Sequence, residues 1–131
     1  MPFSMLNFEF NNNAPLKVIA GPCQIESKDH AMMMAEIIYG ICLDLGVRLV
    51  FKSSFDKANR SSLKGKRGVG IDEGLKILSD IKSKFDIPVL TDIHAPEQAS
   101  VVAEVVDVIQ IPAFLCRQTD LIVAAGNTDC W

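Results

Sequence analysis

The segment from residue 52 to 67 concentrates side chains that bind anions. Six Lys or Arg against one Asp give it a formal charge of +5, whereas the whole chain carries −3. Arg presents a planar fork that matches phosphate oxygens, and Lys presents a compact charge. Hydroxyl pairs at residues 53–54 and 61–62 add short donors. This chemistry predicts a site for a phosphorylated or carboxylated small molecule, with a solvated surface loop as the alternative.

Three more reactive side chains follow short apolar runs elsewhere in the chain: Cys23, Asp92 and His94. A thiolate binds soft or borderline divalent ions such as Zn²⁺ or Fe²⁺, but a catalytic metal site needs about three protein ligands. A His after a strand is also a common hydrogen-bonded scaffold residue. Both interpretations of His94 therefore stay open on the residues alone.

The elements that position these residues alternate between strand and helix. We expect strands at 16–20, 47–51, 87–91 and 106–111, and helices at 28–45, 71–85, 96–105 and 117–125. Ser27 is a good N-cap for the first helix. Such alternation predicts parallel strands whose following loops gather at one end of a sheet. A (β/α)8 barrel and a flavodoxin-like open sheet both have this property, so periodicity does not separate them.

Residues 1–16 contain the loop-forming run NNNAP, and we expect them to be irregular or to form a short hairpin. The chain of 131 residues, 49% apolar and 22% charged, is typical of one soluble domain. Its mild acidity argues against a nucleic-acid partner. Neither a membrane span nor a signal peptide is recognisable, so we expect a cytoplasmic protein.

The four cysteines form no CxxC pair and give no sign of a disulfide framework. We therefore expect Cys42, Cys116 and Cys130 to be small buried apolar residues. Cys23 is the exception because of its place directly after the first strand.

Four stretches resemble the 3-deoxy-D-manno-octulosonate 8-phosphate (KDO8P) synthase family. The run FKSSFDKANRSS at 51–62 carries the family signature, and IAGPCQIES at 19–27, TDIH at 91–94 and QIPAFLCRQTD at 110–120 agree with it. The resemblance spans residues 17–125, about the first half of the family's sequence. It implies a (β/α)8 barrel of which residues 1–131 form the first four βα units as one domain. It also implies condensation of phosphoenolpyruvate with arabinose 5-phosphate, in lipopolysaccharide precursor synthesis.

The resemblance assigns roles to single residues. Lys52 and Lys57 would hold phosphoenolpyruvate, whereas Asn59, Arg60 and Ser61 would hold the sugar phosphate. Asp92 and His94 would be catalytic residues beside the substrates. The remaining substrate-side positions are Ser54, Gln110, Pro112, Ala113, Phe114 and Arg117. Arg117 would reach a neighbouring subunit's sugar phosphate, with a local helix-start pair with Asp120 as its alternative.

Cys23 matches the metal-binding Cys of the metal-dependent branch, whose ion would be Zn²⁺ or Fe²⁺. The family's other ligands, a His, a Glu and an Asp, lie in the half that has no counterpart here. We therefore expect neither the metal nor the family's tetramer to be held by these 131 residues, and no activity from them alone.

The tail at 126–131 departs from the family pattern, where a strand with a Lys pair is expected. A premature stop, a frameshift or a deliberate half barrel are the explanations. Two other functions stay open. One is a non-catalytic half barrel that binds a phosphorylated ligand or associates with another half barrel. The other is a 3-deoxy-heptulosonate 7-phosphate synthase. The KANRSS run argues against this function, because in that family the corresponding loop resembles Lys-Pro-Arg-Thr-Ser.

Overall fold

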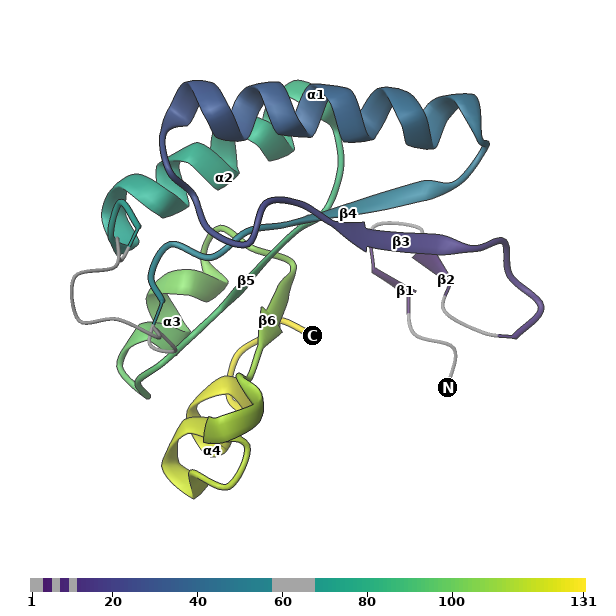
Figure 1. Ribbon diagram of the computed structural model, residues 1–131. Coiled ribbons are helices and arrows are strands. Elements are labelled where there is room, and N and C mark those ends of the chain that lie inside the picture. Colours follow the sequence, from purple (N-terminus) through teal and green to yellow (C-terminus); the bar gives the residue numbers. More distant parts are fainter. Residues whose placement is uncertain (1–3, 6–7, 10–11, 58–67) are drawn as a thin grey trace.

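The computed structural model describes residues 4–5, 8–9, 12–57 and 68–131. In chain order the elements are β1 (Ser4–Met5), β2 (Phe8–Glu9), β3 (Lys17–Ala20), α1 (Lys28–Asp44), β4 (Arg48–Lys52), α2 (Ile71–Phe85), β5 (Val89–Asp92), α3 (Gln98–Ala103), β6 (Val108–Gln110), the 3-10 turn η1 (Ala113–Leu115) and α4 (Thr119–Gly126). Figure 1 shows α1 and α2 lying together along one side of the strands. β1 and β2 pair antiparallel, which confirms the short hairpin.

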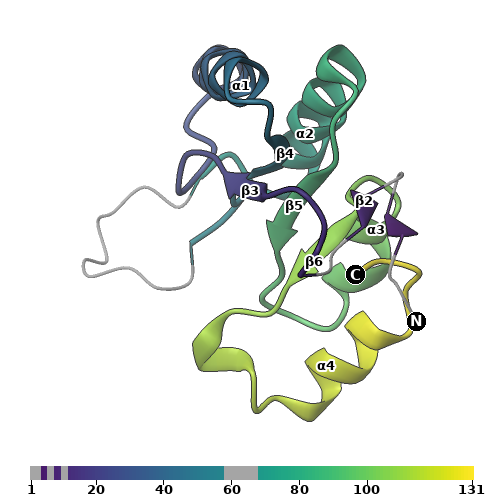
Figure 2. The same ribbon diagram turned by 90° about the vertical axis from the view of Figure 1, so that its right-hand side faces the viewer.

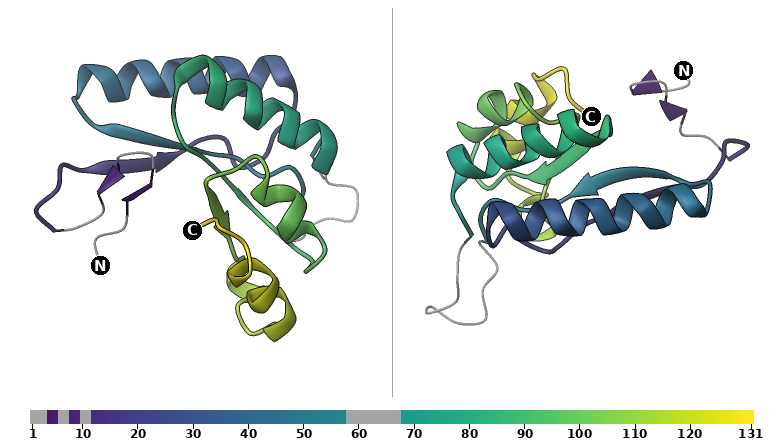
Figure 3. Two further views of the ribbon diagram at one scale, coloured as in Figure 1. Left: turned by 180° about the vertical axis from the view of Figure 1, so that it is seen from behind. Right: turned by 90° about the horizontal axis from the view of Figure 1, so that it is seen from above.

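The strands β3, β4, β5 and β6 form one parallel sheet in the order of the chain. A flavodoxin-like sheet reverses its strand order at a switch point, as in 2-1-3-4-5. The described sheet has no such reversal, and each new strand is added to the same edge. This strand order is that of four consecutive units of a (β/α)8 barrel rather than of a flavodoxin-like sheet, and it confirms the predicted fold class. Figures 2 and 3 show the strongly twisted sheet from its side, from behind and from above.

One face of the sheet is packed against helices. The strand residues Leu49, Phe51, Val89 and Ile109 belong to one buried cluster together with apolar residues of α1, α2 and α3. Along β4 these residues alternate with Val50, as the pleat of a strand requires. Most of the described apolar core therefore lies between the sheet and its helices.

The other face of the sheet is covered much less. Val50 and Leu90 form a separate small cluster, and Val108 and Trp131 pack against it. The Trp131 backbone N–H donates to the Asp107 carbonyl at 3.2 Å, and the Trp131 carbonyl accepts from Ile109 N–H at 2.7 Å. This is the bonding pattern of a parallel pair, so Trp131 lies on the outer edge of β6 as the next strand would.

All eight predicted strands and helices agree with the structure to within two residues at each end. The Ser27 side chain accepts from His30 N–H at 3.2 Å, which confirms the predicted N-cap of α1. α3 is shorter than predicted, because residues 95–97 form turns whose carbonyls bond to the first helical N–H groups. α4 begins at Thr119 rather than 117, because the η1 turn uses the residues before it.

The prediction that three cysteines are buried holds only in part. Cys42 is buried and Cys130 is partly buried, but Cys116 is exposed because it follows the surface turn η1. Among the described residues, the structure has no helix long and apolar enough to span a membrane.

Candidate functional site

The segments that follow β3 and β4 are bound side by side at the carboxyl end of the sheet. The Ser54 N–H donates to the Cys23 carbonyl at 3.4 Å, and the Ile25 N–H donates to the Ser54 carbonyl at 2.9 Å. Gly21 makes this approach possible, because a Cβ there would collide with the Lys52 carbonyl. The exposed Cys23 is thereby held next to the cationic segment.

A ladder of buried hydroxyl groups fixes three strand ends. The Thr91 hydroxyl donates to the Ser53 carbonyl at 2.8 Å, and the Ser53 hydroxyl donates to the Pro22 carbonyl at 2.8 Å. Thr91 and Ser53 are fully buried. Each such bond contributes about 1 kcal/mol, and leaving a buried partner unpaired costs more. The ends of β3, β4 and β5 are therefore fixed relative to one another beneath the candidate site.

Asp92 and His94 form a pair at the end of β5. His94 Nε2 lies 3.1 Å from Asp92 Oδ2, and both side chains are largely buried. The His94 backbone N–H donates to Gln98 Oε1 at 2.8 Å, and the imidazole meets the edge of the Phe55 ring with centroids 6.0 Å apart. An ionised Asp92 would fix the proton of the imidazole on Nε2.

The pKa of Asp92 is lowered to about 2. Burial acts most strongly and raises this pKa, but it is outweighed by hydrogen bonding from His94 and Ser54 and by the positive charges of Lys57 and His94. Asp92 is therefore a carboxylate throughout the neutral range and carries a negative charge that interacts with Lys57.

Lys57 is joined to the same group through a hydroxyl. Its ammonium Nζ donates to Ser54 Oγ at 2.6 Å, and its backbone N–H donates to Asp56 Oδ1 at 2.7 Å. The structure thus brings together four of the predicted site residues: Lys57 bonds to Ser54, His94 bonds to Asp92, and both Ser54 and Lys57 help to lower the pKa of Asp92. Lys52 ends β4 on the neighbouring strand, where it pairs with Leu90.

Two polar atoms in this group are buried without a partner. Neither Asp92 Oδ1 nor His94 Nδ1 has a hydrogen bond to any described residue. Buried polar atoms in native proteins are nearly always paired with protein, water or ligand. This pattern is typical of a site that a polar molecule enters.

The other predicted site residues lie outside the group formed by Lys57, Ser54, Asp92 and His94, or outside the described residues. Asn59, Arg60 and Ser61 lie outside the described residues. Gln110 pairs with Asp92 across the sheet, and its carbonyl accepts from Ile93 N–H at 3.2 Å. Pro112 is buried, whereas Ala113, Phe114 and Arg117 are exposed, Phe114 by 81%. The described residues therefore do not enclose Phe114 in a pocket floor, and the substrate roles of these residues stay predictions.

Phe55 is an important residue that the sequence reasoning missed. It is 1% exposed, and Gly68 and Gly74 approach it so closely that a Cβ on either would collide with it. The Gly70 N–H also donates to the Phe55 carbonyl at 3.1 Å. Phe55 thus fixes the chain from Gly68 to Gly74 against the end of β4. An aromatic residue inside a polar run, followed by several glycines, was the available signal.

Cys23 was predicted to be a metal ligand. Among the described residues, no three His, Cys, Asp or Glu side chains gather into a possible metal site. The exposed thiol of Cys23 can supply one soft ligand, but the described donors do not fit a complete site. The metal stays a prediction.

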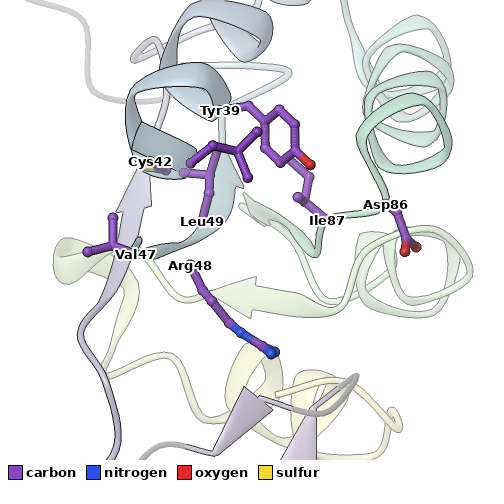
Figure 4. Close-up of a pocket in the computed structure, with 8 residues that line it drawn as sticks. Tyr39, Cys42, Val47, Arg48, Leu49, Asp86 and Ile87 are labelled. Atoms are coloured by element: carbon purple, nitrogen blue, oxygen red, sulfur yellow. The ribbon is translucent and has the colours of Figure 1, made fainter. Parts of the chain in front are cut away.

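A cavity of about 170 Å³ lies at the opposite end of the strands, where β4 begins. Figure 4 shows Tyr39 and Ile87 extending toward each other, while Arg48 and Asp86 point away from them. A ligand pocket usually combines an apolar lining with converging polar groups, which this cavity lacks. The candidate site is therefore the group at the carboxyl ends.

Known proteins resemble this chain over nearly its whole length. The sequence profile described as the DAHP synthetase I family matches residues 7–131. The chain is 58% identical over 122 residues to proteins named 2-dehydro-3-deoxyphosphooctonate aldolase, that is, KDO8P synthases, from Brucella ovis, Brucella canis and Brucella suis. Each match covers 93% of this chain and 44% of the relative. The resemblance noted in the sequence is thereby confirmed, and the chain spans less than half the length of these relatives.

Proposed function

The chain belongs to the DAHP synthetase I family, and on that premise we propose that it supplies the first half of a KDO8P synthase site. The reaction would join carbon 3 of phosphoenolpyruvate to the aldehyde of arabinose 5-phosphate. Water would add at carbon 2, and inorganic phosphate would leave. The 58% identity to the octonate enzymes favours arabinose 5-phosphate over the shorter sugar of the heptulosonate enzymes.

The observation that carries the proposal is the connected group Lys57, Ser54, Asp92 and His94. It lies at the carboxyl ends of the strands, where barrel enzymes place their active sites. It combines the ammonium of the partly exposed Lys57 with a carboxylate and an imidazole whose remaining polar atoms have no partner among the described residues. Such a group can hold an anion and exchange a proton with it.

This chain's residues would bind and orient the substrates. Lys52 and Lys57 would neutralise the carboxylate and phosphate of phosphoenolpyruvate, and Arg60 would hold the phosphate of the sugar. Preorganised charge of this kind is usually the largest catalytic contribution. A divalent Zn or Fe ion, with Cys23 as its one ligand from this chain, would supply Lewis acidity in the complete site. The complete enzyme would act in the cytoplasm as a homo-oligomer in which Arg117 reaches a neighbouring subunit.

The test is to co-express these 131 residues with the part of the Brucella ovis relative that they do not match. We expect phosphoenolpyruvate to be consumed only when arabinose 5-phosphate is present, and no turnover by the 131 residues alone. Turnover with erythrose 4-phosphate instead would favour the heptulosonate reaction. A complex that forms but consumes neither sugar would overturn the proposal in favour of a non-catalytic half barrel.

A matched pair of variants tests the site within that complex. Lys57→Met should lower kcat/KM on the order of a hundredfold, because it removes a preorganised donor from the anion site. Lys28→Met removes a lysine whose partner is the surface residue Asp80, and it should leave turnover unchanged. Equal effects of the two variants would refute the assignment of Lys57.

A further inference from the structure

We propose that Ser54 is a positioning residue rather than a direct substrate ligand: its buried hydroxyl holds the Lys57 ammonium beside Asp92 and thereby couples Lys57 to His94. The identity of the anion that Lys57 binds rests on the proposed function. The coupling between Lys57 and His94 requires no bound ligand.

Burial gives the first argument. Ser54 is fully buried, whereas Lys57 is partly exposed. A molecule arriving from solvent therefore reaches the ammonium before it reaches the hydroxyl. At 2.6 Å, the Nζ–Oγ contact is short for a hydrogen bond, as expected when the donor is charged.

The chemistry of a hydroxyl gives the second argument. An ammonium group only donates and a carboxylate only accepts, but a hydroxyl does both. Ser54 can accept from Lys57 and still direct its own proton toward Asp92, whose pKa it helps to lower. A direct Lys57–Asp92 ion pair would bring the two opposite charges into contact. With the hydroxyl between them, the ammonium is oriented while its other donors can face an anion.

The far end of the group gives the third argument. Asp92 bonds to His94 through Oδ2, and the charged side chains that act on Asp92 are Lys57 and His94. Asp92 Oδ1 and His94 Nδ1 are both buried without partners. A change at Lys57 can therefore reach the imidazole through Ser54 and Asp92.

Ser53 provides a matched control on the same strand end. It is as fully buried as Ser54, but its hydroxyl donates to the Pro22 carbonyl and, among the described residues, forms no hydrogen bond with Lys57 or Asp92. Removing it should weaken the fold without changing the environment of Lys57. The two neighbouring serines thus separate a positioning role from a structural one.

The experiment is nuclear magnetic resonance of the ligand-free 131-residue chain, with labelled Lys side chains and His rings. In Ser54→Ala we expect the Lys57 signals to move to those of a free exposed lysine and the His94 ring nitrogens to shift. Ser54→Thr, which keeps the hydroxyl, should restore both sets of signals. Ser53→Ala should lower the unfolding midpoint and leave both sets unchanged.

A titration with phosphoenolpyruvate adds a second readout. Ser54→Ala should weaken its binding on the order of tenfold, the size expected for one hydrogen bond to a charged group. If the unmodified chain binds no phosphoenolpyruvate, the ligand-free spectra alone decide the coupling, and the co-expressed complex decides the proposed function.

Unchanged Lys57 and His94 signals in a folded Ser54→Ala chain would overturn the inference. If Ser54→Ala does not fold, Lys57→Met replaces it, because Lys57 is partly exposed. The His94 ring signals should then shift, and their failure to do so would equally overturn the coupling.

Discussion

The two faces of the parallel sheet differ in how far this chain completes them. The helix-facing side buries a large apolar cluster built from β4, β5, β6 and the helices α1 to α3. The opposite side buries Val50 and Leu90, with Val108 and Trp131 against them. In a (β/α)8 barrel this second face is the barrel interior, filled by residues from all eight strands. Four strands are therefore enough to build the helix layer but supply only part of the interior.

The difference also explains where the chemistry lies. The polar residues of the candidate site follow the same strands, and Asp92 and Gln110 are paired at the ends of β5 and β6. They are supported by hydrogen bonds between neighbouring strand ends, such as the hydroxyl ladder, and these bonds need no further strand. The chain can thus preorganise part of a site whose surrounding barrel it does not close.

The sharpest test of the comparison is a pair of leucine truncations. Leu78, on α2, is fully buried in the helix layer, and Leu90, on β5, is 4% exposed in the small interior cluster. Leu78→Ala should lower the free energy of unfolding by about 3–5 kcal/mol, and Leu90→Ala by about 2 kcal/mol, because an open face can relax around the lost side chain. Urea denaturation measures both. Equal losses would mean that the two faces are equally well packed.

Trp131 tests whether the interior cluster depends on the edge of β6. Trp131→Ala should cost about 2–3 kcal/mol, below the range for a fully buried aromatic residue, because the side chain is only partly buried. Trp131→Phe keeps an apolar ring there and should lose less than half as much. Denaturant titration followed by circular dichroism gives both values. No loss in the Ala variant would contradict the packing of Trp131 on this face.

A substitution of Asp92 tests how much its charge contributes to the stability of the chain. Its folded pKa of about 2 lies below the ordinary value of 3.8, so its contribution is complete above about pH 4 and is lost as the pH falls toward 2. The difference corresponds to about 2 kcal/mol of stability at neutral pH. Asp92→Asn should remove that amount and flatten the stability curve between pH 4 and pH 2. The exposed Asp129→Asn serves as the control, and an identical acid limb in both variants would refute the assignment.

The smallest expected effect concerns the outer surface of the helix layer. Gly40 lies inside α1 with open space where a Cβ would be, so Gly40→Ala should stabilise the chain by about 1 kcal/mol. Gly21→Ala should have the opposite sign, because its Cβ meets the Lys52 carbonyl. Thermal unfolding compares the two variants. A destabilising Gly40→Ala would indicate that another surface packs closely on α1.

Several elements could be read from the sequence because their signals are local. The apolar spacing and acidic first turn of 71–85 correctly predicted α2, and Ser27 correctly predicted the start of α1. The start of α4 lies two residues later than predicted because the η1 turn depends on backbone bonds that apolar spacing does not reveal. The exposure of Cys116 was missed for the same reason.

By itself the sequence determined the alternating strands and helices, the family, and the residue types of an anion site. These follow from periodicity and from the chemistry of side chains close together in the chain. Only the tertiary structure decided the unreversed strand order, the unequal packing of the two faces, and the placement of Lys57 and Ser54 near Asp92 and His94. These depend on contacts between residues distant in sequence, which no local pattern specifies.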